Sequence, residues 1–541
     1  MLDREFDVCI IGTGITGTLV ADHFLAKGAS VLMLDRSNDV YLPAKRAEYW
    51  HSIWKASWQK IKGKKHYITQ NNWAEAADYF DDLVSVENAQ PEFAFHYNMK
   101  YGLGGSGAVW SGASWRLTPE DFATQSLFGY GLDWPFPYAE LAPYYDRIEQ
   151  IYSTSGPTEV PDWPWKNNYK YPAFKQSYLD SVVGRLFAPD YIVTPVPFSV
   201  KNLPATEGGC VGAKNCVNRC PANARYRPDV DILFKHLQDD KADLTLLMGT
   251  PCLKLNLSKD QRIQSADILH KGQPKTVKAK YFFLAANTIE NLRILLNSED
   301  EQQGAVANAN GLLGAYFASH GAVPTSVTLD EPVYPGRGRP MTSAAINTLN
   351  HAQRGEFNSY MMEVLNTDRH IGLTPIGMLR NIRYKERHWG TTLFNKIKEA
   401  HNRFAATYIF EIEMRKSNNV TLSSVKDKVG LPLAKVNFKL SERDQRSLDF
   451  LFGAAKQLKD KPGVKAVNIP GYGLNGNHPL GGYICGNDPE TSVVDAWMRS
   501  HEHDNLYILG GGVFNSTSAL NPTLTISALA LKALDDPRIK L

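Results

Sequence analysis

An uninterrupted apolar run opens the chain, and apolar positions at helical spacing follow it. Residues 6–11, FDVCII, have the length and the β-branched content of a strand. The apolar residues that then recur on one helical face are Leu19, Val20, Phe24 and Leu25. Gly28 ends this predicted helix, and the apolar SVLML of residues 30–34 predicts a second strand. The pattern therefore predicts a βαβ unit at the start of the chain.

The turn of this βαβ unit carries glycines, and its second strand ends on an acidic residue. Gly12, Gly14 and Gly17 form G-x-G-x-x-G, and Asp35 follows about 20 residues later. Glycine lets the backbone approach a pyrophosphate, the positive helix N-terminus stabilises its charge, and the acid accepts hydrogen bonds from a ribose. A lone glycine motif also occurs in ordinary turns. The complete series of strand, glycine turn, helix, second strand and acidic residue predicts a dinucleotide site. It does not separate FAD from NAD.

Composition and charge restrict the partners. The chain has 541 residues, of which 43% are hydrophobic and 21% charged, enough for more than one domain. A net charge of +3 without a long Lys/Arg run argues against nucleic acid or an anionic membrane as partner and favours a small molecule. The N-terminus lacks a signal-peptide pattern and no apolar run reaches the roughly 20 residues of a membrane span, so we expect a cytoplasmic chain on its own signals.

Three of the six cysteines lie together in a loop-like stretch. Cys210, Cys216 and Cys220 stand in GGCVGAKNCVNRCPANARY, residues 208–226, which is rich in glycine and asparagine and has no apolar periodicity. Buried structural thiols, a zinc site and an iron–sulfur cluster are the three interpretations. Zinc usually takes four ligands and no fourth is near in sequence, whereas three thiolates and the C-x3-C-P ending suit an iron–sulfur cluster. The other cysteines are scattered, so no disulfide framework is predicted.

The C-terminal segment carries a more specific pattern. In residues 476–535 a histidine is followed three and four residues later by glycines, then by SVVD, NLYILGGGVF and NPTLTISALAL. This order resembles the signature of the glucose-methanol-choline (GMC) family of flavin oxidoreductases. Segments that resemble the family's flavin-cradling loop, its third nucleotide-contacting strand and its substrate-domain hairpin are residues 102–112, 279–298 and 418–438. The stretch 41–100 matches least.

The resemblance implies an α/β fold of the GMC type, with a Rossmann-like FAD-binding domain and a substrate domain built on an antiparallel sheet. The FAD-binding domain, including the cysteine loop at 208–226, is expected from residues 1–40, 95–320 and 465–541. The substrate domain is expected from residues 321–464. Insertions or loops are expected at 41–94 and 130–205. No histidine stands in the AVWSG loop, so we expect FAD to be noncovalent.

The residues that the resemblance implies for FAD binding come from both ends of the chain and from its middle. They are Gly12, Gly14, Gly17, Asp35, Arg36, Gly104, Gly105, Ser106, Ala108, Ala286, Asn287, Gly511, Asn521, Pro522 and Thr523. Two positions depart from the common family pattern. Gly510 stands where many members have aspartate, and Cys485 stands near where a methionine is usual, which leaves the packing beside the flavin open.

The same resemblance assigns a base and a hydrogen-bond donor. Alcohol oxidation by a flavin needs the hydroxyl proton removed as hydride leaves the same carbon, and histidine titrates near neutrality. The family histidine falls on His478, and its partner position falls on Asn521, whose amide can orient the substrate oxygen but cannot titrate. His320 matches a family position expected near the nucleotide, whereas the polar RSHEHDN predicts solvated His501 and His503.

Two segments narrow the resemblance within the family. WSGASWRLTPEDF and DWPFPYAELAPYYDRIE resemble the catalytic subunits of bacterial sugar dehydrogenases acting on gluconate, glucose and fructose, and the related glucoside 3-dehydrogenases. Those flavoproteins carry a cysteine group here, which implies a 3Fe-4S cluster on Cys210, Cys216 and Cys220 and an external electron acceptor, such as a cytochrome or quinone-linked subunit. A small subunit with its own export signal would allow a periplasmic location. An O2-using pyranose oxidase and a non-catalytic FAD-binding subunit are the alternatives.

Overall fold

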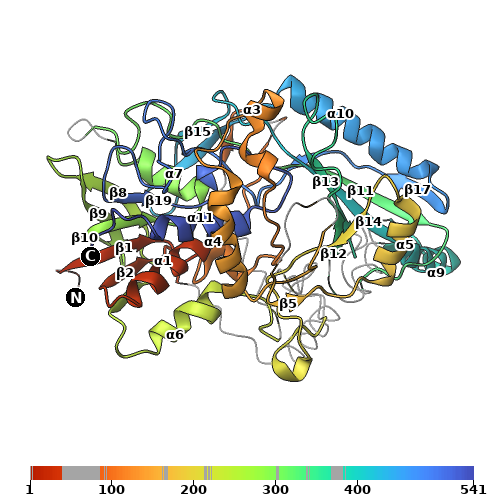
Figure 1. Ribbon diagram of the computed structural model, residues 1–541, viewed down its shortest axis with the longest axis horizontal. Coiled ribbons are helices and arrows are strands. Elements are labelled where there is room, and N and C mark those ends of the chain that lie inside the picture. Colours follow the sequence, from red (N-terminus) through yellow and green to blue (C-terminus); the bar gives the residue numbers. More distant parts are fainter. Residues whose placement is uncertain are drawn as a thin grey trace.

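The computed structural model places two β-sheets side by side, with helices around each (Figure 1). The N-terminal strand and the C-terminal helix lie in the same half of the molecule. The structure describes residues 2, 4–38, 86–90, 92, 94–160, 163, 168–212, 216, 220, 222–299, 304–336, 339, 341–366, 382–383 and 386–541. Most of the predicted insertion at 41–94 therefore lies outside the described residues.

The first sheet contains the predicted βαβ unit. Its strands are β1 (Glu5–Ile11), β2 (Val31–Leu34), β7 (Leu244–Leu247), β8 (Cys252–Leu257), β9 (Ile263–His270), β10 (Gln273–Leu284) and β19 (Leu506–Ile508). Four of them are parallel neighbours in the order β7-β2-β1-β10, and β19 joins β10, also in parallel. The early part of β10 pairs antiparallel with β9, which pairs with β8. This mixed, mainly parallel sheet confirms the α/β class.

The second sheet is antiparallel throughout, as expected for the substrate domain. Its strands are β6 (Val193–Pro195), β11 (Gly321–Leu329), β12 (Met341–Ala345), β13 (Tyr360–Leu365), β14 (Arg403–Phe410), β17 (Val464–Asn468) and β18 (Gly473–Leu474). Their order is β17-β11-β14-β13-β12-β6, with β18 beside β11. The sheet thus also includes β6, from the stretch 130–205 that was expected to form insertions or loops.

The predicted hairpin at 418–438 forms and contacts a helix at the first sheet. It consists of β15 (Asn419–Lys426) and β16 (Pro432–Asn437), with β3 (Glu87–Asn88) parallel to β16. Arg293 of α7 (Thr288–Leu296) donates to the Pro432 carbonyl at 2.7 Å and to Asp427 at 2.7 Å. These bonds join the hairpin to the helix that follows β10. A smaller parallel pair is β4 (Ser155–Gly156) and β5 (Tyr171–Pro172).

The helices pack around both sheets. Within the described residues, the α-helices besides α7 are α1 (Ile15–Leu25), α3 (Thr124–Phe128), α4 (Tyr138–Ile151), α5 (Tyr178–Phe187), α6 (Phe234–Leu237), α9 (Gly390–Glu399), α10 (Glu442–Gln457) and α11 (Thr523–Leu534). Shorter helical turns include η3 (Gly105–Ala108), η4 (Pro119–Phe122) and η10 (Gly511–Val513). The C-terminal α11 packs against α1 and α4, so both ends of the chain share one core.

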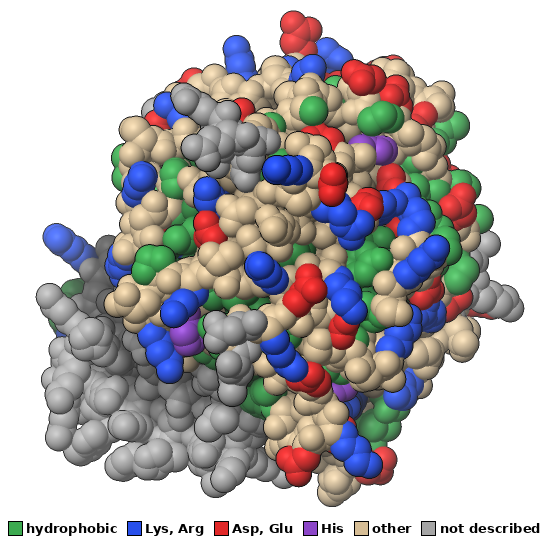
Figure 2. All heavy atoms as spheres, turned by 90° about the vertical axis from the view of Figure 1, so that its left-hand side faces the viewer, with side chains coloured by type: hydrophobic (Ala, Val, Ile, Leu, Met, Phe, Trp, Pro, Cys, Tyr) green, Lys and Arg blue, Asp and Glu red, His purple; other side chains and the backbone are tan. Residues whose placement is uncertain are grey.

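The surface agrees with the low net charge. On the face that lies at the left of Figure 1, acidic and basic side chains are interspersed (Figure 2). Within the described part of the chain, no helix is both long and apolar enough to cross a membrane.

Candidate functional site

The carboxyl ends of the parallel strands gather several of the predicted cofactor segments. The Gly12 amide donates to the Leu34 carbonyl at 2.9 Å, and the Ala285 amide donates to the Ile11 carbonyl at 2.8 Å. The loops after β1, β2 and β10 therefore leave the sheet together, and β19 runs parallel to β10 beside them. Ligands of such sheets bind outside this edge.

The turn after β1 requires glycine and leaves one face open. Gly12 has a φ of +110°, and a Cβ there would lie 2.4 Å from the Ala285 carbonyl oxygen. At Gly14 the nearest atom to such a Cβ would be 3.9 Å away, so this side of the turn is open. Gly14 also precedes α1, whose N-terminus has no side-chain cap. Free N–H groups beside open space suit a pyrophosphate.

The predicted flavin-cradling loop lies against this turn. The Gly104 amide donates to Thr13 Oγ1 at 3.2 Å, and Thr13 Oγ1 donates to Asp35. A Cβ on Gly105, the first residue of η3, would lie 3.2 Å from the Gly14 Cα. The η3 turn also contains the predicted Ser106 and Ala108. Two glycine-rich loops that lie far apart in sequence therefore face each other, as a shared cofactor site requires.

The two residues after β2 have different surroundings. Asp35 is buried and accepts a hydrogen bond from the Ser37 amide at 2.9 Å, and burial raises the pKa of its carboxyl group. The Arg36 guanidinium instead pairs with Glu290 at 2.9 Å and with Asp427 at 3.0 Å. Asp35 remains a candidate ribose ligand, whereas Arg36 connects α7 to the β15–β16 hairpin.

The turn between β10 and α7 is held in an unusual conformation. Asn287 has a φ of 83°, which is rare for a residue with a side chain. Its Oδ1 accepts a hydrogen bond from the Tyr97 hydroxyl at 3.0 Å, and the preceding Ala286 amide donates to Asn291 Oδ1 at 2.9 Å. These bonds hold the predicted nucleotide-contacting turn at the open edge of the sheet.

The segment that carries His478 is tied to the loop after β19. The Gly481 amide donates to the Gly511 carbonyl at 3.0 Å, and Thr288 Oγ1 of α7 donates to the Pro479 carbonyl at 2.8 Å. A Cβ on Gly511 would lie 2.7 Å from that same Pro479 oxygen. Glycine at this position thus permits the close approach that brings the histidine segment to the edge of the sheet.

His478 contacts a second histidine. Its Nδ1 lies 2.9 Å from the Nδ1 of His320, which is fully buried. His320 Nε2 donates to the Thr517 carbonyl at 2.9 Å, since a carbonyl can only accept. Burial lowers the pKa of His320 to about 4, so its ring is neutral at neutral pH and its Nδ1 accepts. When His478 Nδ1–H donates to this atom, His478 Nε2 is left free to take a proton.

Asn475 offers His478 Nδ1 an alternative hydrogen bond. Its Nδ2 lies 3.0 Å from His478 Nδ1, and its Oδ1 accepts from the Asn477 amide at 3.1 Å. A donating amide favours the His478 tautomer that carries its proton on Nε2, whereas His320 favours the tautomer with Nε2 free. His478 therefore has a partner in both tautomers, and the form bonded to His320 is the one that can act as a base.

Asn521 lies directly before α11. Its Oδ1 is buried and has no hydrogen-bond partner among the described residues. The N-terminus of α11, at the predicted Pro522 and Thr523, has no side-chain cap. A buried polar atom without a partner is costly, so a bound molecule with a polar group here would remove that cost. Together with the open face at Gly14, this shows that the described residues fit a dinucleotide cofactor and a polar substrate.

The surroundings of His478 predict how its action as a base depends on pH. Burial, and secondarily His320, lower the pKa of His478 well below 6.5. The neutral imidazole, which alone can accept a proton, therefore prevails at every pH above that lowered value. We expect the rate of flavin reduction by substrate, measured anaerobically by stopped flow, to hold from neutral pH down through 6.5 and to fall only in more acid solution. A rate of flavin reduction that already falls at pH 6.5 or above would contradict this prediction.

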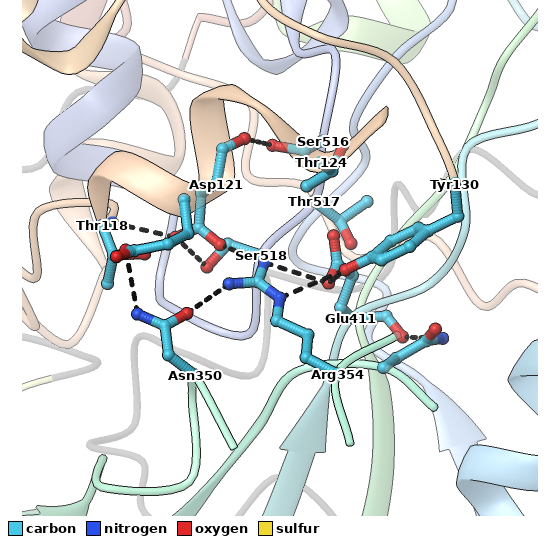
Figure 3. A network of polar contacts seen from close by, with 12 residues as sticks. Thr118, Asp121, Thr124, Tyr130, Asn350, Arg354, Glu411, Ser516, Thr517 and Ser518 are labelled. Atoms are coloured by element: carbon cyan, nitrogen blue, oxygen red, sulfur yellow. Dashed lines mark hydrogen bonds and ion pairs between the residues drawn. The ribbon is translucent and has the colours of Figure 1, made fainter. Parts of the chain in front are cut away.

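A buried polar network supports the segment that receives the His320 hydrogen bond (Figure 3). Arg354 is 1% exposed and pairs with Asp121 at 2.6 Å and with Glu411 at 3.4 Å. Ser518 Oγ donates to the Asp121 carboxylate at 2.9 Å. The network thus joins η4, the residue after β14 and the neighbours of Thr517, whose carbonyl holds the second histidine.

Arg354→Met would leave two carboxylates buried without their cation. Removing one partner of a buried ion pair costs about 3–5 kcal/mol, so we expect a clear fall in the thermal unfolding temperature followed by circular dichroism. Arg185→Met is the matched control, because Arg185 pairs with Glu331 on the surface and such pairs contribute about 1 kcal/mol or less. Equal effects of the two substitutions would show that the buried network is not a main source of stability.

The structure places the three predicted cysteines within electrostatic range of one another. The Cys216 thiol interacts electrostatically with those of Cys210 and Cys220, and all three act on Arg339. The Gly212 amide donates to Cys210 Sγ at 3.5 Å. Among the described residues, no group of three or more His, Cys, Asp or Glu side chains is arranged to hold a metal ion.

Zinc and an iron–sulfur cluster would require different spacings of the three thiols. Thiolates on one zinc ion lie roughly 4 Å apart, because each Zn–S bond is about 2.3 Å long. In an iron–sulfur cluster each thiolate binds a different iron, so its ligands stand farther apart. The cluster on these cysteines stays a prediction.

Arg225 links the cysteine loop to the flavin-cradling loop. Its buried guanidinium donates to the Gly107 carbonyl at 3.1 Å and to the Ala108 carbonyl at 2.6 Å. The thiols of Cys216 and Cys220 act electrostatically on the same guanidinium. One side chain thus interacts with both predicted cofactor sites, which makes them neighbours.

One histidine prediction was wrong. His503, expected to be solvated, is 1% exposed; its Nε2 accepts from the Ala307 amide at 3.1 Å and its Nδ1 donates to the Gln261 carbonyl at 2.6 Å. Two distant loops cover the polar RSHEHDN turn, and the imidazole satisfies their backbone groups. His501 is half-buried, with its Nε2 2.9 Å from Ser492 Oγ.

Comparisons with known proteins give a family model, curated relatives and a solved structure that are similar to this chain. A family model described as GMC oxidoreductase matches residues 415–530. Fructose dehydrogenase large subunit of Gluconobacter japonicus is 27% identical over 98% of this chain and 97% of its own length. Paromamine 6′-oxidase of Streptomyces fradiae is 26% identical over 98% of this chain and 91% of its own length. The crystal structure of pyridoxine 4-oxidase from Mesorbium loti has the same fold, with a TM-score of 0.66 at 15% identity, covering 99% of this chain and 100% of that one.

Proposed function

The chain belongs to the GMC oxidoreductase family, whose members bind FAD and act on CH–OH groups, and we propose that it is a sugar or polyol dehydrogenase. In this proposal it oxidises a hydroxyl group to a carbonyl and passes the electrons through a 3Fe-4S cluster to an external acceptor. The proposed ligands of the cluster are Cys210, Cys216 and Cys220.

The contact made by Arg225 carries this proposal. Its guanidinium bonds to the Gly107 and Ala108 carbonyls and interacts electrostatically with Cys216 and Cys220. An electron relay needs its two centres close together, and a cysteine group beside the flavin-cradling loop supplies that closeness. The similarity to a fructose dehydrogenase large subunit supports the substrate class.

Each residue of the site has a proposed role in binding or in catalysis. The glycine turn and the N-terminus of α1 would hold the pyrophosphate, and Asp35 the ribose. FAD held there would supply the acceptor for the hydride that leaves the substrate carbon. His478 takes the hydroxyl proton at Nε2, and the Asn521 amide donates a hydrogen bond to the substrate oxygen and orients it. His320 holds the base through its Nδ1.

An external acceptor is part of the proposal. A cluster held by the three cysteines would supply one-electron transfer, so the proposal includes a redox partner such as a cytochrome or quinone-linked subunit. The relative's description as a large subunit supports a multi-subunit assembly. A small subunit with an export signal would take the folded chain to the periplasm.

The alternative is an oxidase that uses O2. The relative described as paromamine 6′-oxidase favours it, because that protein matches nearly the whole chain. The two functions share the same base and the same flavin site and differ only in what reoxidises the cofactor.

Anaerobic titration of the purified flavoprotein with a panel of sugars and polyols tests the proposal. We expect at least one of them to bleach the flavin absorbance. A one-electron acceptor such as ferricyanide should then restore the absorbance much faster than O2 does. No bleaching by any member would refute the substrate class, and stoichiometric peroxide would favour the oxidase.

A further inference from the structure

Arg339 is a buried cation whose guanidinium has no hydrogen-bond partner in the described part of the chain. Its side chain is 5% exposed, and Nε, Nη1 and Nη2 all lack a partner among the residues that the structure describes. The guanidinium lies over two aromatic rings, 4.0 Å from the centre of Phe174 and 3.6 Å from that of Phe198. These rings fix its plane and shield it from water.

The aromatic contacts do not compensate for the burial of this charge. A desolvated cation–π contact returns only part of the free energy that the removal of an ion from water costs. The groups whose charges act on Arg339 are the thiols of Cys216, Cys210 and Cys220, and no described carboxylate is among them. The charge that would balance the guanidinium therefore belongs at the cysteines.

Arg225 differs from Arg339 in its hydrogen bonds. It lies near the same cysteines, but its guanidinium nitrogens donate to the carbonyls of Gly107, Ala108 and Tyr226. Its hydrogen bonds attach it to the flavin-cradling loop. Arg339 has no such attachment among the described residues, so its donors are available to an anion.

We propose that Arg339 is the counter-ion of the iron–sulfur cluster and raises the reduction potential of that cluster, an inference that rests on the proposed function. A cluster held by three thiolates is an anion, and it gains one more negative charge on reduction. A nearby cation stabilises the reduced form more than the oxidised form. Because burial removes solvent screening, the effect is large for a single charge.

Potentiometric titration of the purified holoprotein with dithionite, followed by EPR, tests this role. We expect Arg339→Gln to make the one-electron reduction at least tenfold less favourable, a shift of about 59 mV to lower potential. Arg339→Lys keeps the charge and should retain most of the wild-type potential. Arg185→Gln is the control, because it removes the same charge from an exposed ion pair and should change nothing.

Iron content and flavin absorbance of each variant complete the test. Loss of iron from Arg339→Gln alone, with FAD still bound, would also support the counter-ion role. If the wild type holds a cluster and Arg339→Gln has the same iron content and potential, the role of Arg339 is refuted while the proposed function stands. If the wild type holds no iron, the relay itself is refuted and this inference with it.

Discussion

His478→Ala is expected to leave FAD bound and to slow flavin reduction by substrate by about 10²–10⁴-fold, the usual contribution of a positioned base. His478 Nε2 is free when Nδ1 donates to His320, and its lowered pKa keeps it neutral. In the proposed mechanism this substitution removes the group that accepts the hydroxyl proton as the hydride leaves. Anaerobic stopped flow of the flavin absorbance measures the rate directly, and the absorbance before mixing reports bound FAD.

His401→Ala is the matched control for this substitution. His401 is exposed and its carbonyl accepts backbone hydrogen bonds from Val333 and Tyr334, so its imidazole can be removed without changing these bonds. We expect wild-type reduction rates from this variant. Reduction at the wild-type rate by His478→Ala would show that another group is the base.

Cys216→Ser is expected to impair electron transfer to the external acceptor while leaving flavin reduction by substrate intact. Loss of one of three thiolates should abolish or greatly reduce iron binding, since serine is a poor ligand for this metal. Substrate should still bleach the flavin at close to the wild-type rate, because the base and the glycine turn are unchanged. Turnover with a one-electron acceptor should fall by orders of magnitude.

Cys252→Ala controls for the loss of a cysteine elsewhere. Cys252 is buried at the start of β8 in the first sheet and interacts electrostatically with Cys9 and Asp267. This variant should keep its iron and its turnover. Full turnover by Cys216→Ser with the external acceptor would exclude a relay through the three cysteines.

Local patterns explain why the N-terminal unit could be predicted. The strand expected at 6–11 is β1, Glu5–Ile11, and the strand expected at 30–34 is β2, Val31–Leu34. Strand and helix periods, glycine turns and helix ends are all encoded by neighbouring residues. The C-terminal signature around His478 and Asn521 is also local, and the roles of these two residues stay a prediction.

Contacts between distant segments could not be predicted. His320 and His478 are 158 positions apart, and nothing in the sequence around either one marks the other as its partner. Arg339 lies in a glycine- and proline-rich stretch without periodicity, so neither its burial nor its nearness to the cysteines has a sequence signal. The burial of His503 likewise depends on loops that come from other parts of the chain.

Quantification of iron and acid-labile sulfide per FAD in anaerobically purified protein, together with low-temperature EPR, tests the central claim most directly. A dehydrogenase with a relay on the three cysteines should contain about three irons per FAD and show the EPR signal of an oxidised three-iron cluster. Protein that binds FAD and turns over a sugar with peroxide formation, but contains no iron, would contradict it.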